Sequence, residues 1–248
     1  MQPPTQRVPV ICLPFAGAGA SFFRAWRDLA PERLLIAPVQ LPGREDRLDE
    51  EPYATVAEAV DDLVPELLDV AERYPHLIVF GHSFGAVLAY EVTRHLARHL
   101  PPTALSLVVS GSPAPHEPRA RRATGLPDEE FLARVREFAG YDHPTLADPG
   151  ARELLLPVLR SDIALHENYL PAPGATPLPL PITAVLGTRD HLVSPEQTAR
   201  WQRATTHPLR QEALDGGHMY LTESPADLLA LMDASVSDAL DDVRSPRP

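Results

Sequence analysis

Short apolar segments alternate with longer amphipathic ones along most of the chain. Most of the short segments are rich in Val, Ile and Leu and lack the polar alternation of a strand with one face in water. Strands of this kind are covered on both faces, which is typical of a parallel sheet between helices. We therefore expect an α/β fold, with a mostly parallel sheet flanked by helices and strands at residues 8–13, 33–39, 77–81, 104–110, 181–187 and 209–214.

Several of the longer segments carry signals for the start of a helix. Thr55 and Glu58 have the spacing of a capping box, and apolar residues then recur at helical spacing over residues 56–71. Ser194 precedes a proline that would occupy the first turn of a helix, where its missing N–H costs nothing. Pro65 falls inside the 56–71 segment, so we expect a kink there.

The alternation breaks between residues 112 and 178. This stretch contains two expected helices, at residues 128–139 and 149–169, among proline-rich connections. Its apolar side chains, including Phe131 and Leu155, need a surface to cover. We expect residues 112–178 to form a helical lid inserted after the fourth strand, with Phe131 and Leu155 among its substrate contacts.

The length of the chain favours one domain. With 248 residues and 44% apolar side chains, it can bury one good core and is short for two. We expect a single domain over residues 8–240. Residues 1–7 and 241–248 are polar and contain proline, so we expect flexible tails.

Charge and cysteine content exclude several classes of protein. The net charge is −12 and all 22 basic residues are arginine, without a long basic run, which argues against a nucleic-acid partner. No apolar run approaches the roughly 20 residues of a membrane span, and no signal peptide is expected. Cys12 is the only cysteine, which excludes an internal disulfide, argues against a zinc cluster and fits a cytoplasmic location. We expect no metal and no resident cofactor.

The clearest chemical signal is the segment Gly81-His82-Ser83-Phe84-Gly85. It follows an expected strand and precedes a helical apolar pattern, which is the context that a Gly-x-Ser-x-Gly nucleophile elbow requires. A serine on so sharp a turn brings the chain on either side into close contact, where a Cβ would clash. We therefore expect Ser83 to be a catalytic nucleophile.

A nucleophilic serine needs a base and an acid that orients the base. In the α/β-hydrolase fold the chain order is serine, then acid, then histidine, each after a strand. Asp190 follows the strand expected at 181–187, and His218 follows the last strand, so we assign Ser83, Asp190 and His218 as the catalytic triad.

Other residues compete for two of these roles. Asp215 is the rival acid, although its sequence context is that of a turn residue. His191 and His82 are the rival bases; His191 has the context of a surface loop, and His82 lies inside the elbow. We retain Asp190 and His218 because of their positions after strands.

The glycine-containing loop after the first strand, residues 13–20, supplies a further element. Backbone N–H groups of such a loop and of the residue after the nucleophile form an oxyanion hole, which we assign to Phe15 and Phe84. A loop that cradles phosphate is the alternative. Gly17 and Gly19 lack the third glycine of a dinucleotide site and the Gly-Lys-Ser/Thr of a P-loop, so that alternative is weaker.

Five motifs, given below in chain order, resemble those of the type II (external) thioesterases that accompany polyketide and nonribosomal peptide synthases. The resemblance covers about residues 8–240. The Pro-Gly-Arg-Glu motif is the most discriminating of them. The motifs are Pro14-Phe15-Ala16-Gly17, Leu41-Pro42-Gly43-Arg44-Glu45-x-Arg47, Gly81-His82-Ser83-Phe84-Gly85, Gly187-x-x-Asp190-x-x-Val193 and Gly217-His218-Met219-Tyr220.

This resemblance implies a substrate and a partner. Members of the family hydrolyse acyl groups from the phosphopantetheine thiol of acyl or peptidyl carrier proteins, clear stalled chains in antibiotic biosynthesis, and have a mobile lid. The partner would be a carrier-protein domain, bound transiently, and small acyl thioesters would also react. Arg119, Arg121 and Arg122 are the candidate docking residues.

Two other functions remain open at this point. A small-molecule carboxylesterase or lipase would share the fold and the triad, although the chain lacks the His-Gly-Gly-Gly loop of the common esterases. A binding module without catalytic activity would also share the fold, and an intact triad in the correct order argues against it.

Overall fold

The computed structural model describes residues 7–118, 122–139 and 148–244. Its centre is a six-stranded sheet in the order β2-β1-β3-β4-β5-β6, and every neighbouring pair is parallel. This confirms the expected class. The strands are β1 Val8–Leu13, β2 Leu34–Pro38, β3 Leu77–His82, β4 Leu105–Ser110, β5 Ile182–Gly187 and β6 Arg210–Leu214.

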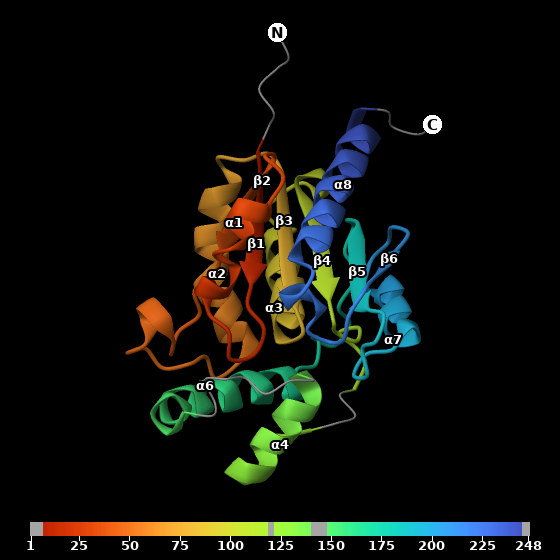
Figure 1. Ribbon diagram of the computed structural model, residues 1–248. Helices are drawn as coiled ribbons and strands as arrows, with labels where there is room; N and C mark the ends of the chain where they lie inside the picture. Colours follow the sequence, from red (N-terminus) through yellow and green to blue (C-terminus); the bar gives the residue numbers. More distant parts are fainter. Residues whose placement is uncertain (1–6, 119–121, 140–147, 245–248) are drawn as a thin grey trace.

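Helices cover both faces of the sheet, in three layers (Figure 1). The helices are α1 Trp26–Leu29, α2 Val56–Ala71, α3 Phe84–Leu96, α7 Pro195–Ala199 and α8 Pro225–Arg244. Successive residues of β1 point to opposite faces of the sheet: Ile11 and Leu13 belong to the apolar cluster beneath α2 and α3, while Val10 and Cys12 belong to the cluster beneath α1 and α8. Short 3-10 turns lie at Ala20–Phe23, Glu45–Arg47, Pro102–Ala104, Arg200–Ala204 and Tyr220–Thr222.

The expected boundaries agree closely with the structure, with one difference at the C-terminus. The Thr55 hydroxyl accepts from the Glu58 N–H at the start of α2, as expected, and the helix includes Pro65, where the kink stays a prediction. Helix α8 extends to Arg244, so the first four residues of the expected C-terminal tail are helical. The apolar spacing of Val236, Leu240 and Val243 continues the helical period into that segment.

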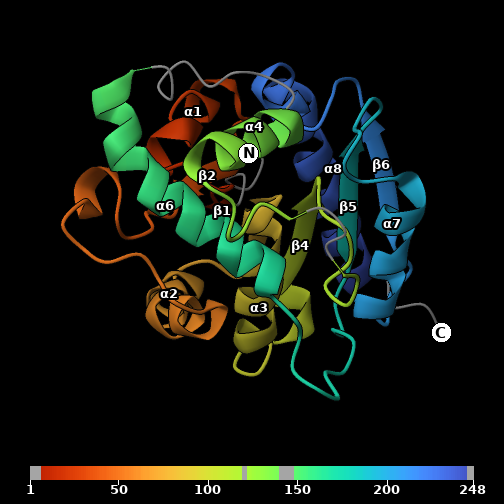
Figure 2. The ribbon, with the colours of Figure 1, turned by 90° about the horizontal axis from the view of Figure 1, so that it is seen from below.

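The inserted segment contains two helices, α4 Asp128–Ala139 and α6 Pro149–Asn168. Figure 1 shows both beyond the end of the sheet to which the strand arrows point, and Figure 2 shows α6 crossing that end and finishing near α3. Phe131, Leu132, Leu159 and Ile163 form a small core between the two helices. The insert therefore covers the carboxyl ends of the strands.

The strand order places a topological switch point between β1 and β3, because β2 lies on one side of β1 and β3 on the other. In open parallel sheets, sites form outside the carboxyl ends of the strands at such a point. The loops after β1 and β3 both begin there. None of the helices within the described ranges is long and apolar enough to cross a membrane.

Candidate active site

Ser83 stands on a sharp turn between β3 and α3, as the sequence predicts. Its backbone has φ 53° and ψ −115°, and its N–H donates to the Ser110 carbonyl oxygen over 2.8 Å. A Cβ on Gly81 would lie 2.0 Å from the Gly85 carbonyl oxygen, and one on Gly85 would lie 2.3 Å from that of Leu13. Both flanking glycines are therefore required by backbone contact, which defines a nucleophile elbow.

The structure brings Asp190 and His218 together although 28 residues separate them. Asp190 Oδ2 lies 2.9 Å from His218 Nδ1, while its other oxygen accepts from the N–H groups of Leu192 and Val193. The Asp190 side chain is completely buried. Burial raises its pKa, but the hydrogen bond and charge of His218 and the two backbone donors outweigh that effect, so the pKa lies below its ordinary value.

The rival residues lie elsewhere. The Asp215 side chain is 79% exposed and forms an ion pair with Arg189 and a hydrogen bond with Thr188. His191 is exposed on the loop after β5. The geometry therefore gives Asp190, and not Asp215, the position beside His218.

His82 has a supporting position that the sequence does not reveal. It is fully buried, its ring centroid lies 4.9 Å from that of His218, and its Nδ1 lies 2.8 Å from the Ser110 Oγ. The same Oγ lies 2.6 Å from the Tyr220 hydroxyl. Burial, with the nearby His218 and His166, holds the pKa of His82 far below its ordinary value, so His82 adds no charge beside His218.

The loop after β1 lies next to the elbow. The Phe15 ring packs edge-on against His82 with centroids 6.0 Å apart, and the Leu13 and Pro14 carbonyls closely approach Gly85. Phe84 is the first residue of α3, where a helix leaves its N–H groups without an intrahelical acceptor. The two N–H groups assigned to an oxyanion hole thus belong to adjacent segments, and their role stays a prediction.

The two predicted lid residues have different surroundings. Phe131 is fully buried between α4 and α6, with the Arg160 guanidinium carbon 4.1 Å from its ring centroid. Leu155 is half-buried on α6. Contact of either with substrate stays a prediction.

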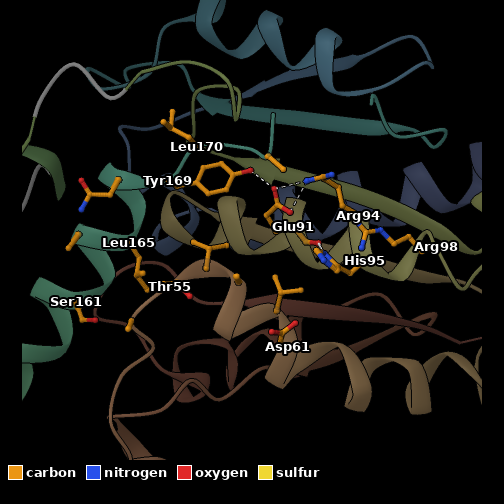
Figure 3. A pocket seen from close by; sticks show the side chains of 17 residues that line it. Thr55, Asp61, Glu91, Arg94, His95, Arg98, Ser161, Leu165, Tyr169 and Leu170 are labelled. Atoms are coloured by element: carbon orange, nitrogen blue, oxygen red, sulfur yellow. Dashed lines mark hydrogen bonds and ion pairs between the residues drawn. The ribbon is translucent and has the colours of Figure 1, made fainter. Parts of the chain in front are cut away.

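A separate pocket of about 540 Å³ lies between α2, α3 and the end of α6 (Figure 3). Its size suits a small molecule, but its lining contains none of the three triad residues. Its Glu91 carboxylate is already satisfied, because Arg94 and the Tyr169 hydroxyl both donate to it. We therefore place the candidate active site at Ser83 and not in this pocket.

The described residues contain no group of three or more metal-ligand side chains. His95 and His99 have the spacing of a helical metal pair, but α3 ends at Leu96, so His99 lies outside the helix. The absence of a cofactor therefore stays a prediction.

The elbow at the switch point, together with the Asp-His pair after β5 and β6, defines a hydrolase of the α/β-hydrolase fold. A model of the thioesterase domain family matches residues 8–235, and the chain belongs to this family. It is 37% identical to the thioesterase PikA5 of Streptomyces venezuelae, over 89% of this chain and 78% of the relative. It is 31% identical to the gramicidin S biosynthesis protein GrsT of Aneurinibacillus migulanus, over 91% and 88%.

Solved structures agree with this assignment. The thioesterase RedJ of the prodiginine pathway of Streptomyces coelicolor is 35% identical, covers 91% of this chain and 89% of its own, and superimposes with a TM-score of 0.81. The type II thioesterase YbtT of the yersiniabactin pathway is 28% identical, covers 96% of both chains and has a TM-score of 0.84. The chain is thus an enzyme of the thioesterase class.

Proposed function

We propose that this enzyme hydrolyses acyl groups from the phosphopantetheine thiol of carrier proteins in a polyketide or nonribosomal peptide pathway, with a clearing role. The observation that carries the proposal is the His218–Asp190 contact beside the Ser83 elbow, in a chain whose relatives are named as thioesterases of such pathways. Ser83, His218 and Asp190 are its catalytic triad.

The reaction has two halves. His218 accepts the Ser83 hydroxyl proton through Nε2 as the oxygen attacks the thioester carbonyl, while Asp190 accepts a hydrogen bond from Nδ1 and holds that tautomer. The C–S bond then breaks, and the thiol leaves with the proton from His218. Water next attacks the acyl-serine by the same route and releases the acid. The N–H groups of Phe15 and Phe84 stabilise the negative oxygen in both halves.

The protein supplies these groups without a cofactor of its own, because the phosphopantetheine belongs to the substrate. A thioester is a sufficiently reactive acyl donor for serine, histidine and backbone donors. The single buried cysteine fits a reducing compartment, so a cytoplasmic location is part of the proposal.

Docking of the carrier protein depends on a local patch in this proposal. The chain carries a net charge of −12, so long-range attraction would not bring an acidic carrier to it. Arg119 and Arg121 lie outside the described residues. Arg122 is exposed within the insert, where its guanidinium donates to Asn168 and lies 3.8 Å from Glu167.

The test compares one acyl group on carrier protein and on a short pantetheine thiol. We expect a higher kcat/KM with the carrier, and we expect Arg122→Glu to lower only the carrier-dependent value. Arg27→Glu is the matched control, because Arg27 is an exposed arginine on α1. Equal kcat/KM on the two thiols would contradict carrier recognition. Faster hydrolysis of the matching oxygen ester would favour a general esterase.

A further inference from the structure

The loop after β1 forms a β-turn from Phe15 to Ala18. The Ala18 N–H donates to the Phe15 carbonyl oxygen over 3.0 Å, and Gly17, the third residue, has φ 78°. A positive φ at the third position marks a type II turn, whose central peptide is turned over relative to a type I turn. The orientation of the Ala16–Gly17 peptide is therefore one of two choices open to this loop.

Asp162 of the insert selects one of these choices. The Gly17 N–H donates to Asp162 Oδ2 over 2.8 Å, although 145 residues separate them. In a type I turn this N–H would point the other way and leave the carboxylate. Leu159, one helical turn earlier on α6, also packs here, since a Cβ on Gly17 would lie 3.0 Å from its Cδ1. Helix α6 thus holds the central peptide of the turn.

Arg44, from the Pro-Gly-Arg-Glu motif, completes the arrangement. Its Nη1 and Nη2 lie 2.6 and 2.8 Å from the two oxygens of Asp162, and Nη1 also donates to the Ala18 carbonyl over 3.0 Å. The two side chains are only 4% and 3% exposed. Burial raises the pKa of Asp162, while Arg44 and the Gly17 N–H lower it, so the ionised carboxylate depends on these partners.

We propose that Arg44 and Asp162 are positioning residues for the oxyanion hole. Asp162 accepts from the Gly17 N–H and Arg44 donates to the Ala18 carbonyl oxygen. These two contacts hold the turn, and so hold the Phe15 N–H where the negative charge develops. The inference rests on the proposed function, because it needs the Phe15 N–H as a donor. It also makes α6 a fixed wall of the active site and assigns any motion of the insert to α4.

The double variant Arg44→Met/Asp162→Leu tests the idea. Replacing a buried ion pair by apolar residues of similar size generally preserves folding, whereas removing one partner leaves a buried charge unpaired. We expect kcat to fall about 10- to 100-fold with little change in KM, because a misplaced oxyanion donor weakens binding of the transition state and not of the substrate.

Ser161→Ala is the matched control. Ser161 precedes Asp162 on α6, and its hydroxyl donates to the Tyr53 carbonyl over 3.2 Å, so the substitution weakens the seating of α6 and leaves the turn intact. We expect its kcat to stay within about twofold of the wild-type value. Asp162→Asn keeps an oxygen that can accept from Gly17, so it should retain more kcat than Asp162→Leu.

Two measurements separate positioning from general destabilisation. The Gly17 amide proton resonance should shift in the double variant and stay in place in Ser161→Ala. The affinity for an alkyl boronic acid, which forms a tetrahedral adduct on the serine, should fall together with kcat, while the affinity for an unreactive acyl thioether should not.

The outcomes are distinct. A folded double variant with the kcat of Ser161→Ala, or with an unchanged Gly17 resonance, would overturn the inference and leave the proposed function standing. If the Ser83→Ala variant hydrolysed thioesters as fast as the wild type, the proposed function would be overturned, and the inference with it.

Discussion

At residue scale, the active site depends on one strained backbone and one long-range contact. Ser83 has φ 53° and ψ −115°, a conformation that side chains rarely adopt, and the packing of Gly81 and Gly85 leaves the chain no other path. Asp190 and His218 meet only because β5 and β6 are neighbours in register. The local turn thus positions the nucleophile, whereas the pairing of β5 with β6 brings its base and acid together.

Removal of the nucleophile should abolish the reaction and leave the fold intact. We expect Ser83→Ala to lower kcat by about 10³-fold or more, because the nucleophile and the base act as a unit. Steady-state thioester hydrolysis and labelling by a fluorophosphonate measure the effect. Ser235→Ala on α8 is the control. Comparable turnover by the purified Ser83→Ala variant would refute the assignment.

The strain at Ser83 predicts a difference in stability between two inactive variants. Ser83→Gly should be more stable than Ser83→Ala by about 1 kcal/mol, because glycine adopts a positive φ without a steric cost. Denaturant unfolding of both variants gives the two free energies. If the alanine variant were the more stable, the elbow would be relaxed and not strained.

The two candidate acids should respond differently to loss of charge. Asp190→Asn should lower kcat by about 100-fold or more, because the amide favours the wrong His218 tautomer. Asp215→Asn removes only an exposed ion pair, which is typically worth less than about 1 kcal/mol, so its kcat should stay near the wild-type value. Steady-state kinetics on both variants test the assignment of the acid. A larger loss of kcat in Asp215→Asn than in Asp190→Asn would reverse it.

At element scale, the two helices of the insert are attached differently. Helix α6 is hydrogen-bonded to the core through Asp162, Ser161 and the residue that follows its end, Tyr169, which contact three separate segments. Helix α4 packs on α6 through the small core around Phe131. A lid that adjusts to its substrate would therefore move at α4, which is our interpretation of the insert.

Weaker packing of α4 should change the preference for acyl-chain length more than the rate of the chemical step. Phe131→Ala removes a fully buried side chain from the α4–α6 core, so we expect faster proteolysis within 122–139 and an altered ranking of acyl-chain lengths by kcat/KM. Leu154→Ala is the control, because Leu154 is 60% exposed. An unchanged ranking in Phe131→Ala would show that α4 does not contact the acyl chain.

At the scale of the whole molecule, buried histidines couple stability to pH. Burial lowers the pKa values of His82 and His76 in the fold, whereas in the unfolded chain these histidines bind their protons below about pH 6.5. Since the unfolded state then holds more protons, the free energy of unfolding falls as pH decreases, by up to about 1.4 kcal/mol per pH unit for each histidine.

Urea unfolding between pH 8 and pH 5 measures this slope. His76→Gln should flatten it, and His207→Gln should not, because His207 is exposed. A slope that does not change in His76→Gln would show that the pKa of this histidine is the same in the folded and unfolded states.

The sequence alone determined the elements and their chemistry, because those signals are local. Strands and helices follow from apolar periodicity over a few residues, and the Ser83 elbow from glycines two positions away. The chain order of the triad followed from the strand order. These features need no knowledge of which distant residues meet.

Only the tertiary structure decided which distant groups meet. Three such contacts are that of Asp190 with His218, that of the buried His82 with His218, and the pairing of Arg44 with Asp162. Such contacts depend on sheet register and on how the insert is seated over the strands. The pattern of residue types along the chain does not encode these contacts, because an aspartate has the same residue type whether it is buried or exposed. Its burial is decided only when the helices pack on the sheet.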